Sequence, residues 1–365
     1  MLITSIRLVN FRNYASLSLR PDAGLCVLTG ENAAGKTNVL ESIFLCALGR
    51  SHRTIRDGEL IKSSENGGYV GITLDTIGGT RQIEVKLAVG ERKKLLIDAS
   101  PLVRSGELLG CLNVVMFAPE DLGLVKDGPG ERRRFLDMMI SQLRPAYYDT
   151  LQKYNAVLKQ RNALLKDAQG QRLHALEPWN EQLALLGASI TLIRTEQVQR
   201  LSQFAKTMHE TLSDGRENLT VVYQPNMPPV ESTQLIDSMR EALIDSVERD
   251  IRYGNTSIGP HRDDLMLALD GVDVRTFGSQ GQQRTVVLSL KLAQLEILRE
   301  EKGDAPVLLL DDVFSELDKH RQRMLLIAVQ GCQTFLTCTH LEEIEAAGAV
   351  QMQVYSVHNG QVIEV

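Results

Sequence analysis

The residues with the clearest chemistry form a phosphate-binding pattern near the start of the chain. The segment reads Gly30, Glu31, Asn32, Ala33, Ala34, Gly35, Lys36 and Thr37. The glycines let a backbone wrap phosphate groups, and a helix that starts there turns free N–H groups toward the negative charge. Lys36 can then reach the β- and γ-phosphates, and the Thr37 hydroxyl can ligate Mg²⁺. An ordinary glycine-rich turn is the alternative.

The residues on either side favour the phosphate site over a plain turn. Leu25–Leu28 is typical of a short buried strand, and residues 38–48 carry apolar side chains at helical spacing. A strand, a loop and a helix in that order are the setting that the pattern requires. The sequence therefore predicts that the chain binds a nucleoside triphosphate.

Two carboxylates follow an unbroken apolar run near the other end of the chain. Residues 307–310 suit a strand buried on both faces of a parallel sheet. Asp311 and Asp312 would then lie at its carboxyl end, where open α/β sheets bind their ligands. Asp311 could hold Mg²⁺ directly or through water, and Asp312 could orient or deprotonate the attacking water. A strand that runs into a solvated acidic turn is the alternative for this segment alone.

A third segment, Phe277–Arg284, precedes a strongly helical pattern at residues 285–298. Ser279 and Gly281 lie where that helix would start, and its free N–H groups could bind a second anion. Taken alone, the segment is better explained as a helix cap with a glycine-rich approach.

Together the three segments resemble those of the ABC-type ATPases, in which two nucleotides are sandwiched between two head domains. The resemblance implies that Ser279 and Gly281 form a signature loop that covers the γ-phosphate held by a second copy. Residues 315–318, ending in Asp318, resemble the D-loop, and His340 resembles the switch histidine that senses the γ-phosphate. ATP, Mg²⁺ and an ATP-dependent homodimer are therefore expected.

The opening residues, Leu2–Tyr14, resemble the first strand of the SMC-like DNA-repair ATPases, and this resemblance places Arg12 among the nucleotide-binding residues. More narrowly, the chain resembles the RecF family of bacterial recombination mediators over essentially its whole length. The stretches that carry this resemblance are 10–14, 30–38, 49–54, 117–122, 259–264 and 311–318.

This resemblance implies binding to DNA at single-strand/duplex junctions, the partner mediators RecO and RecR, and help in loading the RecA recombinase. It also implies weak, DNA-stimulated ATP hydrolysis that acts as a switch. In one departure, Asp312 stands where many ABC-type ATPases have Glu, and a retracted carboxylate predicts slow turnover. The counterpart of the transporter-type glutamine is not evident, and Asn113, Glu120 and Asp121 are all candidates.

The expected fold is α/β: an ABC-type ATPase head with a phosphate-loop mixed sheet, and a compact α-helical insertion arm. The expected boundaries are 1–130 for the first part of the head, 131–240 for the arm and 241–365 for the second part of the head. The arm pattern is helical, with breaks at Pro145, Gly170 and Pro178. After a loop at residues 225–229, a single helix is expected at 233–253, followed by a strand at 265–269.

Composition sets broad limits on the class of protein. The net charge is −6 and the pI about 5.7, so any contact with DNA needs a local basic face. Three basic runs are candidates for phosphate contact, although ion-paired surface is the commoner explanation for each. They are Arg50, His52, Arg53 and Arg56; Arg92, Lys93 and Lys94; and Arg132, Arg133 and Arg134.

The remaining composition favours a cytoplasmic protein without a membrane partner. No apolar run approaches the ~20 residues of a membrane span. Five cysteines form no C-x-x-C pair, which favours reduced packing residues in the cytosol. His261 is ambiguous, because a lone histidine usually packs or lies at the surface, whereas the resemblance places it near a dimer interface or DNA.

Two other classes share part of the pattern. A small-metabolite kinase would have the phosphate loop and the acidic pair but would not need Ser279 or His340. A transporter subunit would share every ATP motif, but the helical arm and the opening strand do not suit it.

Overall fold

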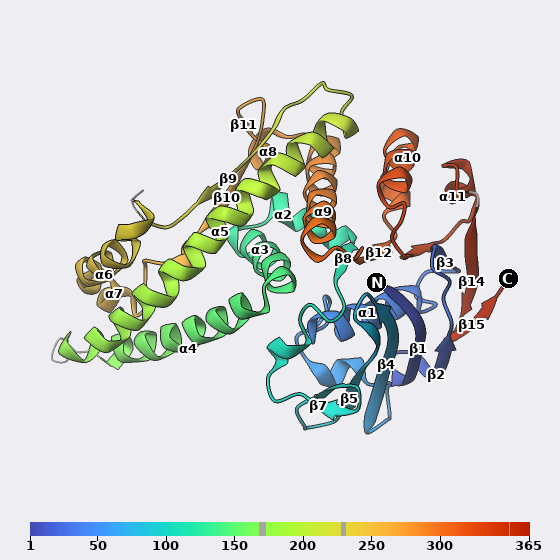
Figure 1. Ribbon diagram of the computed structural model, residues 1–365, viewed down its shortest axis with the longest axis horizontal. Helices are drawn as coiled ribbons and strands as arrows, with labels where there is room; N and C mark the ends of the chain where they lie inside the picture. Colours follow the sequence, from blue (N-terminus) through green and yellow to red (C-terminus); the bar gives the residue numbers. More distant parts are fainter. Residues whose placement is uncertain (168–172, 228–230, 350) are drawn as a thin grey trace. The chain divides into compact units, whose positions relative to one another are not determined.

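The computed structural model describes residues 1–167, 173–227, 231–349 and 351–365, which form two compact units (Figure 1). The first unit contains Met1–Asp121 and Lys291–Val365, and the second contains Leu122–Leu290. The expected boundaries, at 130/131 and 240/241, differ from these. Residues 122–130 and 241–290 belong to the compact unit that contains the inserted segment, and not to the unit that contains the two ends of the chain.

The first unit contains a mixed sheet in the order β15-β14-β3-β13-β12-β8, in which only β15 pairs antiparallel with its neighbour. Every residue of β12 and β13 is buried, as expected for apolar runs without alternation. The strands are β3 (Leu25–Thr29), β8 (Val114–Phe117), β12 (Val307–Asp311), β13 (Thr334–Cys338), β14 (Met352–His358) and β15 (Gln361–Glu364).

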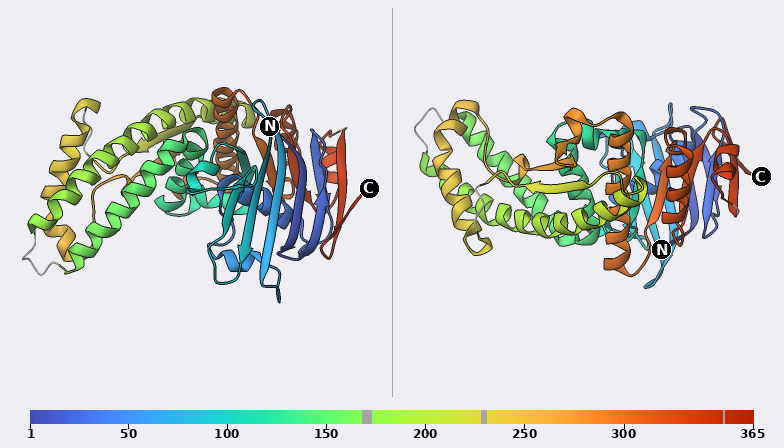
Figure 2. Two further views of the ribbon diagram at one scale, coloured as in Figure 1. Left: turned by 60° about the horizontal axis from the view of Figure 1, so that its bottom comes forward. Right: turned by 90° about the horizontal axis from the view of Figure 1, so that it is seen from above.

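A second, antiparallel sheet of the same unit has the order β2-β1-β4-β5-β6-β7 and is drawn in blue to cyan in Figure 2. Helix α1 (Lys36–Leu48) contacts strands of both sheets, which explains why nearly all of its side chains are buried. The strands are β1 (Leu2–Phe11), β2 (Tyr14–Leu19), β4 (Gly67–Thr76), β5 (Gly79–Ala88), β6 (Lys94–Ile97) and β7 (Ser100–Pro101). The unit also contains α10 (Lys319–Ala328) and α11 (Glu342–Ala346).

The second unit is mainly helical, and its two longest helices, α4 and α5, pack side by side (Figure 1). A three-stranded sheet, β11-β10-β9, joins this unit and was not expected. Because β10 pairs with β9, the segment after residue 240 returns to the inserted unit. The elements are α2 (Gly123–Lys126), α3 (Pro129–Leu143), α4 (Pro145–Asp167), α5 (Glu177–Leu212), β9 (Leu219–Gln224), α6 (Leu235–Asp245), α7 (Val247–Tyr253), β10 (Asp264–Leu269), β11 (Val272–Asp273) and α8 (Val274–Phe277). Helix α9 (Gln280–Lys302) begins in this unit and ends in the first.

The expected breaks in the arm have different outcomes. Pro145 is the first residue of α4, as predicted. Pro178 likewise lies at a break, because α5 begins at Glu177 and the proline occupies its first turn, where a helix needs no N–H donor. The single helix expected at 233–253 is two helices that meet at Ser246. Gly170 and residues 228–229 of the expected loop lie outside the described residues. None of the described helices is long and apolar enough to cross a membrane.

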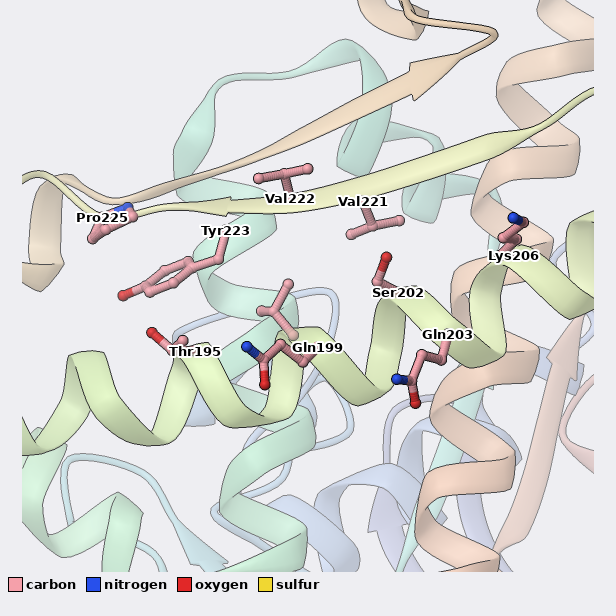
Figure 3. A pocket seen from close by; sticks show the side chains of 10 residues that line it. Thr195, Gln199, Ser202, Gln203, Lys206, Val221, Val222, Tyr223 and Pro225 are labelled. Atoms are coloured by element: carbon pink, nitrogen blue, oxygen red, sulfur yellow. The ribbon is translucent and has the colours of Figure 1, made fainter. Parts of the chain in front are cut away.

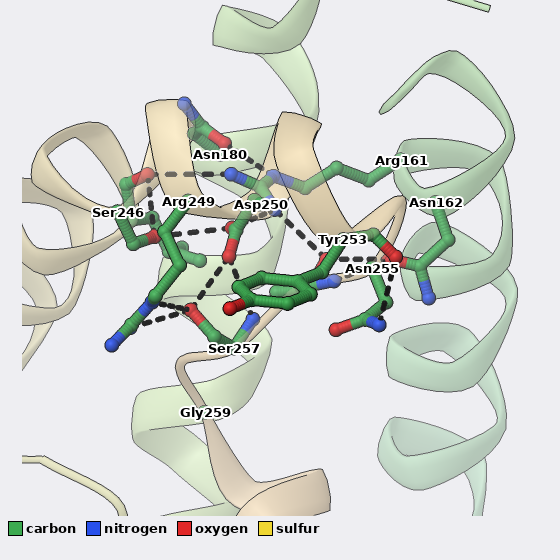
Figure 4. A network of polar contacts seen from close by, with 12 residues as sticks. Arg161, Asn162, Asn180, Ser246, Arg249, Asp250, Tyr253, Asn255, Ser257 and Gly259 are labelled. Atoms are coloured by element: carbon green, nitrogen blue, oxygen red, sulfur yellow. Dashed lines mark hydrogen bonds and ion pairs between the residues drawn. The ribbon is translucent and has the colours of Figure 1, made fainter. Parts of the chain in front are cut away.

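The core of the second unit contains a fully buried ion pair between Arg161 and Asp250, with an N–O distance of 2.7 Å (Figure 4). The Arg161 guanidinium also donates to Asn180 Oδ1 at 2.8 Å and to Thr256 Oγ1 at 2.8 Å. Ser257 donates to the other oxygen of Asp250 through its N–H and its hydroxyl. These bonds tie α4, α5 and α7 together, and each buried charge is compensated by the other.

We expect Arg161→Leu to lower the free energy of unfolding by about 3–5 kcal/mol, because it leaves the Asp250 carboxylate buried without its cation. Urea denaturation followed by circular dichroism measures this loss. The matched control is Arg144→Leu, which removes an Arg–Glu196 pair whose side chains are 35% and 51% exposed. We expect that control to cost less than about 1 kcal/mol, and equal losses for the two variants would contradict the assignment.

Candidate nucleotide site

The phosphate loop has the backbone that its glycines were predicted to allow. Gly30 and Gly35 have φ values of 148° and 121°, and Ala33 has a φ of 65°. A Cβ atom at Gly30 would lie 2.3 Å from the Val357 carbonyl oxygen, and one at Gly35 would lie 2.5 Å from the Asn13 amide. Both positions therefore require glycine for conformation and for space.

The loop rests on the turn between β1 and β2. Asn13 donates through Nδ2 to the Ala34 carbonyl at 2.8 Å, and the Tyr14 hydroxyl donates to the Gly35 carbonyl at 3.0 Å. Asn38, in the first turn of α1, donates to Asn13 Oδ1 at 2.8 Å. The opening segment, which was singled out only by resemblance, thus holds the phosphate loop in shape.

Lys36 is folded into the loop and is only 8% exposed. Its Nζ donates to the carbonyls of Gly30 and Glu31, at 2.5 and 2.9 Å. Burial lowers the pKa of Lys36, and the nearby Asp312 opposes that shift. A phosphate oxygen can replace these carbonyls as the acceptor of the Lys36 hydrogen bonds. The ammonium group is therefore already in place to bind an anion.

The acidic strand end meets the phosphate loop. Thr37 donates through Oγ1 to Asp311 Oδ1 at 2.9 Å, and Thr337 at the end of β13 donates to the same oxygen at 2.7 Å. Burial raises the pKa of Asp311, and these two hydroxyls oppose that rise. A hydroxyl beside a carboxylate is a hard-oxygen donor set that fits Mg²⁺, which keeps most of its other positions for water and phosphate.

Asp312 lies one residue beyond Asp311 but in a different environment. It is exposed, has a φ of 50°, and its N–H donates to Thr337 Oγ1 at 2.9 Å. The left-handed backbone turns the chain sharply at the strand end, so the two neighbouring carboxylates face different surroundings. The structure thus brings together Thr37, Asp311 and Asp312, as the sequence predicted.

Arg12 is held by Glu41 of α1. Its guanidinium donates to both carboxylate oxygens, at 2.8 and 2.6 Å, and to the Glu59 carbonyl at 2.9 Å. Although burial alone would raise the pKa of Glu41, hydrogen bonds from Arg12 and Ser51 keep it below its ordinary value. The predicted contact of Arg12 with nucleotide would therefore compete with a bidentate ion pair in this unit.

Arg53 is a site residue that sequence reasoning missed, because it was grouped with a surface basic run. Its Nη1 donates to Asn38 Oδ1 at 3.2 Å, and its charge lowers the pKa of Asp311. A cation near the Mg²⁺ carboxylate suits phosphate binding at the same site. The signal that could have found it is its position five residues after the end of α1, the helix that begins in the phosphate loop.

The three candidates for the counterpart of the transporter-type glutamine lie in different environments. Asn113 is fully buried, and Asp121 forms an ion pair with Lys291 at 2.6 Å. Glu120 is exposed, and its charge raises the pKa of Asp311. Of the three, only Glu120 is both solvent-accessible and close enough to act on the site electrostatically.

His340 follows β13 and Asp318 follows β12, two neighbouring strands of the mixed sheet. His340 is exposed two residues beyond β13. Asp318 caps α10 by accepting a hydrogen bond from the Arg321 N–H at 2.9 Å, and its carboxylate also pairs with the Arg321 guanidinium. Asp318 thus has a structural role within this chain in addition to the D-loop role implied by resemblance.

The signature loop, Ser279–Gly281, lies in the second unit at the start of α9 and is exposed. Ser279 Oγ accepts from the Gln282 N–H at 3.3 Å, and Gln282 Oε1 accepts from the Ser279 N–H at 2.8 Å. This reciprocal pair is a capping box. The segment therefore caps helix α9, as one of its two explanations from the sequence predicted.

Two other sequence candidates have internal partners in the second unit. Arg132 is 6% exposed and pairs with both oxygens of Asp264, at 2.6 and 3.0 Å, so it is not a surface phosphate contact. His261 donates from Nε2 to the Thr256 carbonyl at 2.9 Å and accepts from the Tyr154 hydroxyl at 2.7 Å. Burial lowers its pKa to about 4, so it is a neutral packing residue.

A groove of about 630 Å³ lies between α5 and β9 (Figure 3). Thr195, Gln199 and Ser202 of the helix face Tyr223 and Pro225 across it. Lys206 is the only cation among the described residues that line it. None of the three segments singled out in the sequence contributes to this groove.

Comparison with known proteins places the chain in a family. The family model described as the RecF/RecN/SMC N terminal domain matches residues 2–363. The DNA replication and repair protein RecF of Alkaliphilus oremlandii is 44% identical over 99% of this chain and all of its own length. The RecF protein of Clostridium acetobutylicum is 41% identical over the full length of both chains.

Solved structures agree. A structure of the recombination mediator protein RecF-ATPrS in the RecFOR pathway matches with a TM-score of 0.93 and 34% identity, covering all of this chain and 98% of that one. The Smc head domain of Pyrococcus furiosus, at 14% identity and a TM-score of 0.59 over all of this chain and 96% of its own, shares the fold. The predicted fold class, an ABC-type ATPase head with an inserted arm, is confirmed. The chain belongs to the RecF family of DNA replication and repair proteins.

Proposed function

We propose that this chain is an ATP-dependent DNA-binding protein of recombinational repair, in which ATP joins two copies into a dimer that holds DNA. The observation that carries the proposal is the meeting of Lys36, Thr37, Asp311 and Asp312 at one edge of the parallel sheet. A mediator structure with bound ATP, 35% identical to this chain with a TM-score of 0.92, supports ATP as the nucleotide.

Within one copy, the residues divide the work of binding the triphosphate. The loop backbone from Gly30 to Gly35 binds phosphate oxygens, and Lys36 supplies the charge. Thr37 and Asp311 would hold Mg²⁺, which neutralises phosphate charge when bound. Asp312, exposed at the strand end, orients the attacking water, and His340 lies beyond the neighbouring strand to contact the γ-phosphate.

The second copy would complete this shell with Ser279 and Gly281. Gly281 supports that assignment, because its φ is not positive and a Cβ placed on it meets nothing within 4 Å. The chain's own fold therefore does not require glycine there. Gly278, three residues earlier, is different, since its Cβ would lie 2.6 Å from the Val274 carbonyl. A glycine with open space around it suits the close approach of an external phosphate.

ATP binding and DNA binding would then be coupled through one dimerisation equilibrium. Two copies related by a two-fold axis form a self-complementary interface, and hydrolysis separates them. Family membership supports the setting: single-strand/duplex junctions as the DNA, RecO and RecR as partners, and assistance to RecA loading. Weak, DNA-stimulated hydrolysis suits a switch, and the short Asp312 side chain suits slow turnover.

The first prediction from this proposed function concerns DNA binding. Fluorescence anisotropy of a labelled gapped duplex, at one stated salt concentration, should show tight binding with ATP and Mg²⁺ only. ADP or no nucleotide should weaken it by roughly tenfold or more, since a coupling of 1–3 kcal/mol is typical of linked ligands. Lys36→Ala is the control and should bind weakly in all three states. Equal binding by the wild-type chain in all three states would contradict the switch.

The second prediction concerns the trans contact. Gly281→Leu should leave the fold and the ATP affinity of the monomer unchanged, because the position is exposed and open, but should prevent ATP-driven dimerisation. Ser279→Arg should act in the same way. Light scattering with and without ATP measures the mass, and loss of ATP binding by the monomeric variants would refute the two-copy site.

The third prediction concerns hydrolysis. Asp312→Asn should keep ATP binding, because Lys36, Thr37 and Asp311 are untouched, and should prolong the dimer after excess ATP is removed. The wild-type turnover should lie well below ~10 per second, the median for enzymes. A variant dimer that dissociates as fast as the wild-type dimer would show that Asp312 does not orient the attacking water.

A further inference from the structure

A chain of three hydrogen bonds leads from the signature loop to His209 in the last turn of α5, and a fourth continues to α9, all within the second unit. Ser279 donates through its N–H to Gln282 Oε1 at 2.8 Å, and Gln282 Nε2 donates to Glu217 Oε1 at 3.0 Å. The other oxygen of Glu217 lies 3.1 Å from His209 Nε2. His209 Nδ1 in turn lies 3.1 Å from the Ser289 hydroxyl of α9.

The protons in this chain can be assigned from chemistry alone. The Ser289 hydroxyl donates to the Thr285 carbonyl at 2.7 Å, and a carbonyl can only accept, so the single hydroxyl hydrogen is used there. His209 Nδ1 must therefore carry a hydrogen and donate it to Ser289 Oγ. Between Nε2 and Glu217 Oε2 one proton must also lie, because two lone pairs cannot form a bond. Whichever atom carries it, Glu217 is held at that oxygen.

This chain of hydrogen bonds is buried at its His209 end and exposed at its Ser279 end. The His209 side chain is fully buried, and that of Glu217 is 24% exposed. Gln282 is half-buried, while Ser279 and Gly281 are exposed. Glu217 comes directly after a turn that begins at the end of α5, with a φ of 52° at Asp214 and 69° at Gly215. A buried anchor thus fixes a surface loop through one carboxylate.

We propose that Glu217 is a positioning residue for the signature loop. It fixes the amide of Gln282, which holds the Ser279 backbone N–H, and it links that loop to His209 at the end of α5. This inference rests on the proposed function, since it concerns the loop that would meet the nucleotide of a second copy. The capping box alone stabilises the start of α9, whereas the Glu217 contact sets where the loop lies relative to α5.

The variant Gln282→Glu separates these two roles of the side chain. A glutamate at this position keeps the capping box, because its carboxylate still accepts from the Ser279 N–H. It loses the amide donor to Glu217 and places a second carboxylate against it. The double variant Glu217→Gln with Gln282→Glu exchanges the donor and the acceptor and so restores the hydrogen bond between positions 217 and 282. Glu210→Gln is the matched control, because it removes a half-exposed carboxylate from the same end of α5.

Two readouts test the proposal, and the melting temperature of each variant separates them from a general loss of stability. The first is the protein concentration at half-maximal ATP-driven dimerisation, which Gln282→Glu should raise by roughly tenfold, since bonds to charged groups are among the stronger ones. The second is hydrogen–deuterium exchange of residues 277–283 without nucleotide, which should become faster in the same variant. The double variant should recover most of both changes, while monomer ATP affinity and melting temperature stay the same.

The other outcomes contradict either the role of Glu217 or the proposed function. Wild-type behaviour of Gln282→Glu in both readouts would overturn the proposal, as would a double variant that recovers neither. A wild-type chain that stays monomeric with ATP would refute the proposed function instead. The exchange readout would then decide by itself whether Glu217 anchors the loop.

Discussion

The hydrogen bond between Thr37 and Asp311 joins residues that are 274 positions apart in the sequence, and the nucleotide site depends on it. It can form because β13 lies between β3 and β12 in a parallel sheet, so the carboxyl ends of all three strands reach one edge. Thr337, at the end of the central strand, bonds to Asp311 and also accepts from the Asp312 N–H. One threonine therefore holds both the carboxylate of Asp311 and the backbone of Asp312 beside the phosphate loop.

The site is built from charges that burial alone would disfavour. Burial lowers the pKa of Lys36 and raises that of Asp311, and each is opposed by neighbours of the other sign or by hydroxyl donors. The loop carbonyls and the threonine hydroxyls already hold Lys36 and Asp311 in place, so these two side chains would need little reorganisation to bind the proposed phosphate and Mg²⁺. Electrostatic preorganisation of this kind is what phosphoryl chemistry requires of a protein.

The sequence predicted the parts of the head whose structure is local or strongly patterned. The loop at Gly30–Thr37, the buried run before Asp311 and the helix after Ser279 all form as expected, because each combines a chemical pattern with its own periodicity. The strands β4–β7 and β9 were not predicted, and β9 pairs with β10, which follows only after α6 and α7. The partner of β9 is distant in sequence, and no local pattern specifies such pairing. By contrast, β4–β7 pair with one another through short hairpins that the sequence analysis missed. Distance in sequence also explains why Arg132 was placed at the surface, when its partner, Asp264, lies 132 residues away.

Position within a unit also separates residues that a pattern treats alike. His261 and His340 are both lone histidines next to strands, the first before β10 and the second after β13. One is neutral and enclosed by Tyr154 and Thr256, whereas the other is exposed beyond a central strand. Gly278 and Gly281 lie in one short loop, yet only the first is required by its own surroundings. The fold itself does not explain the residue type at Gly281 or the exposed position of His340. The contacts proposed above, with the nucleotide and with a second copy, would explain both.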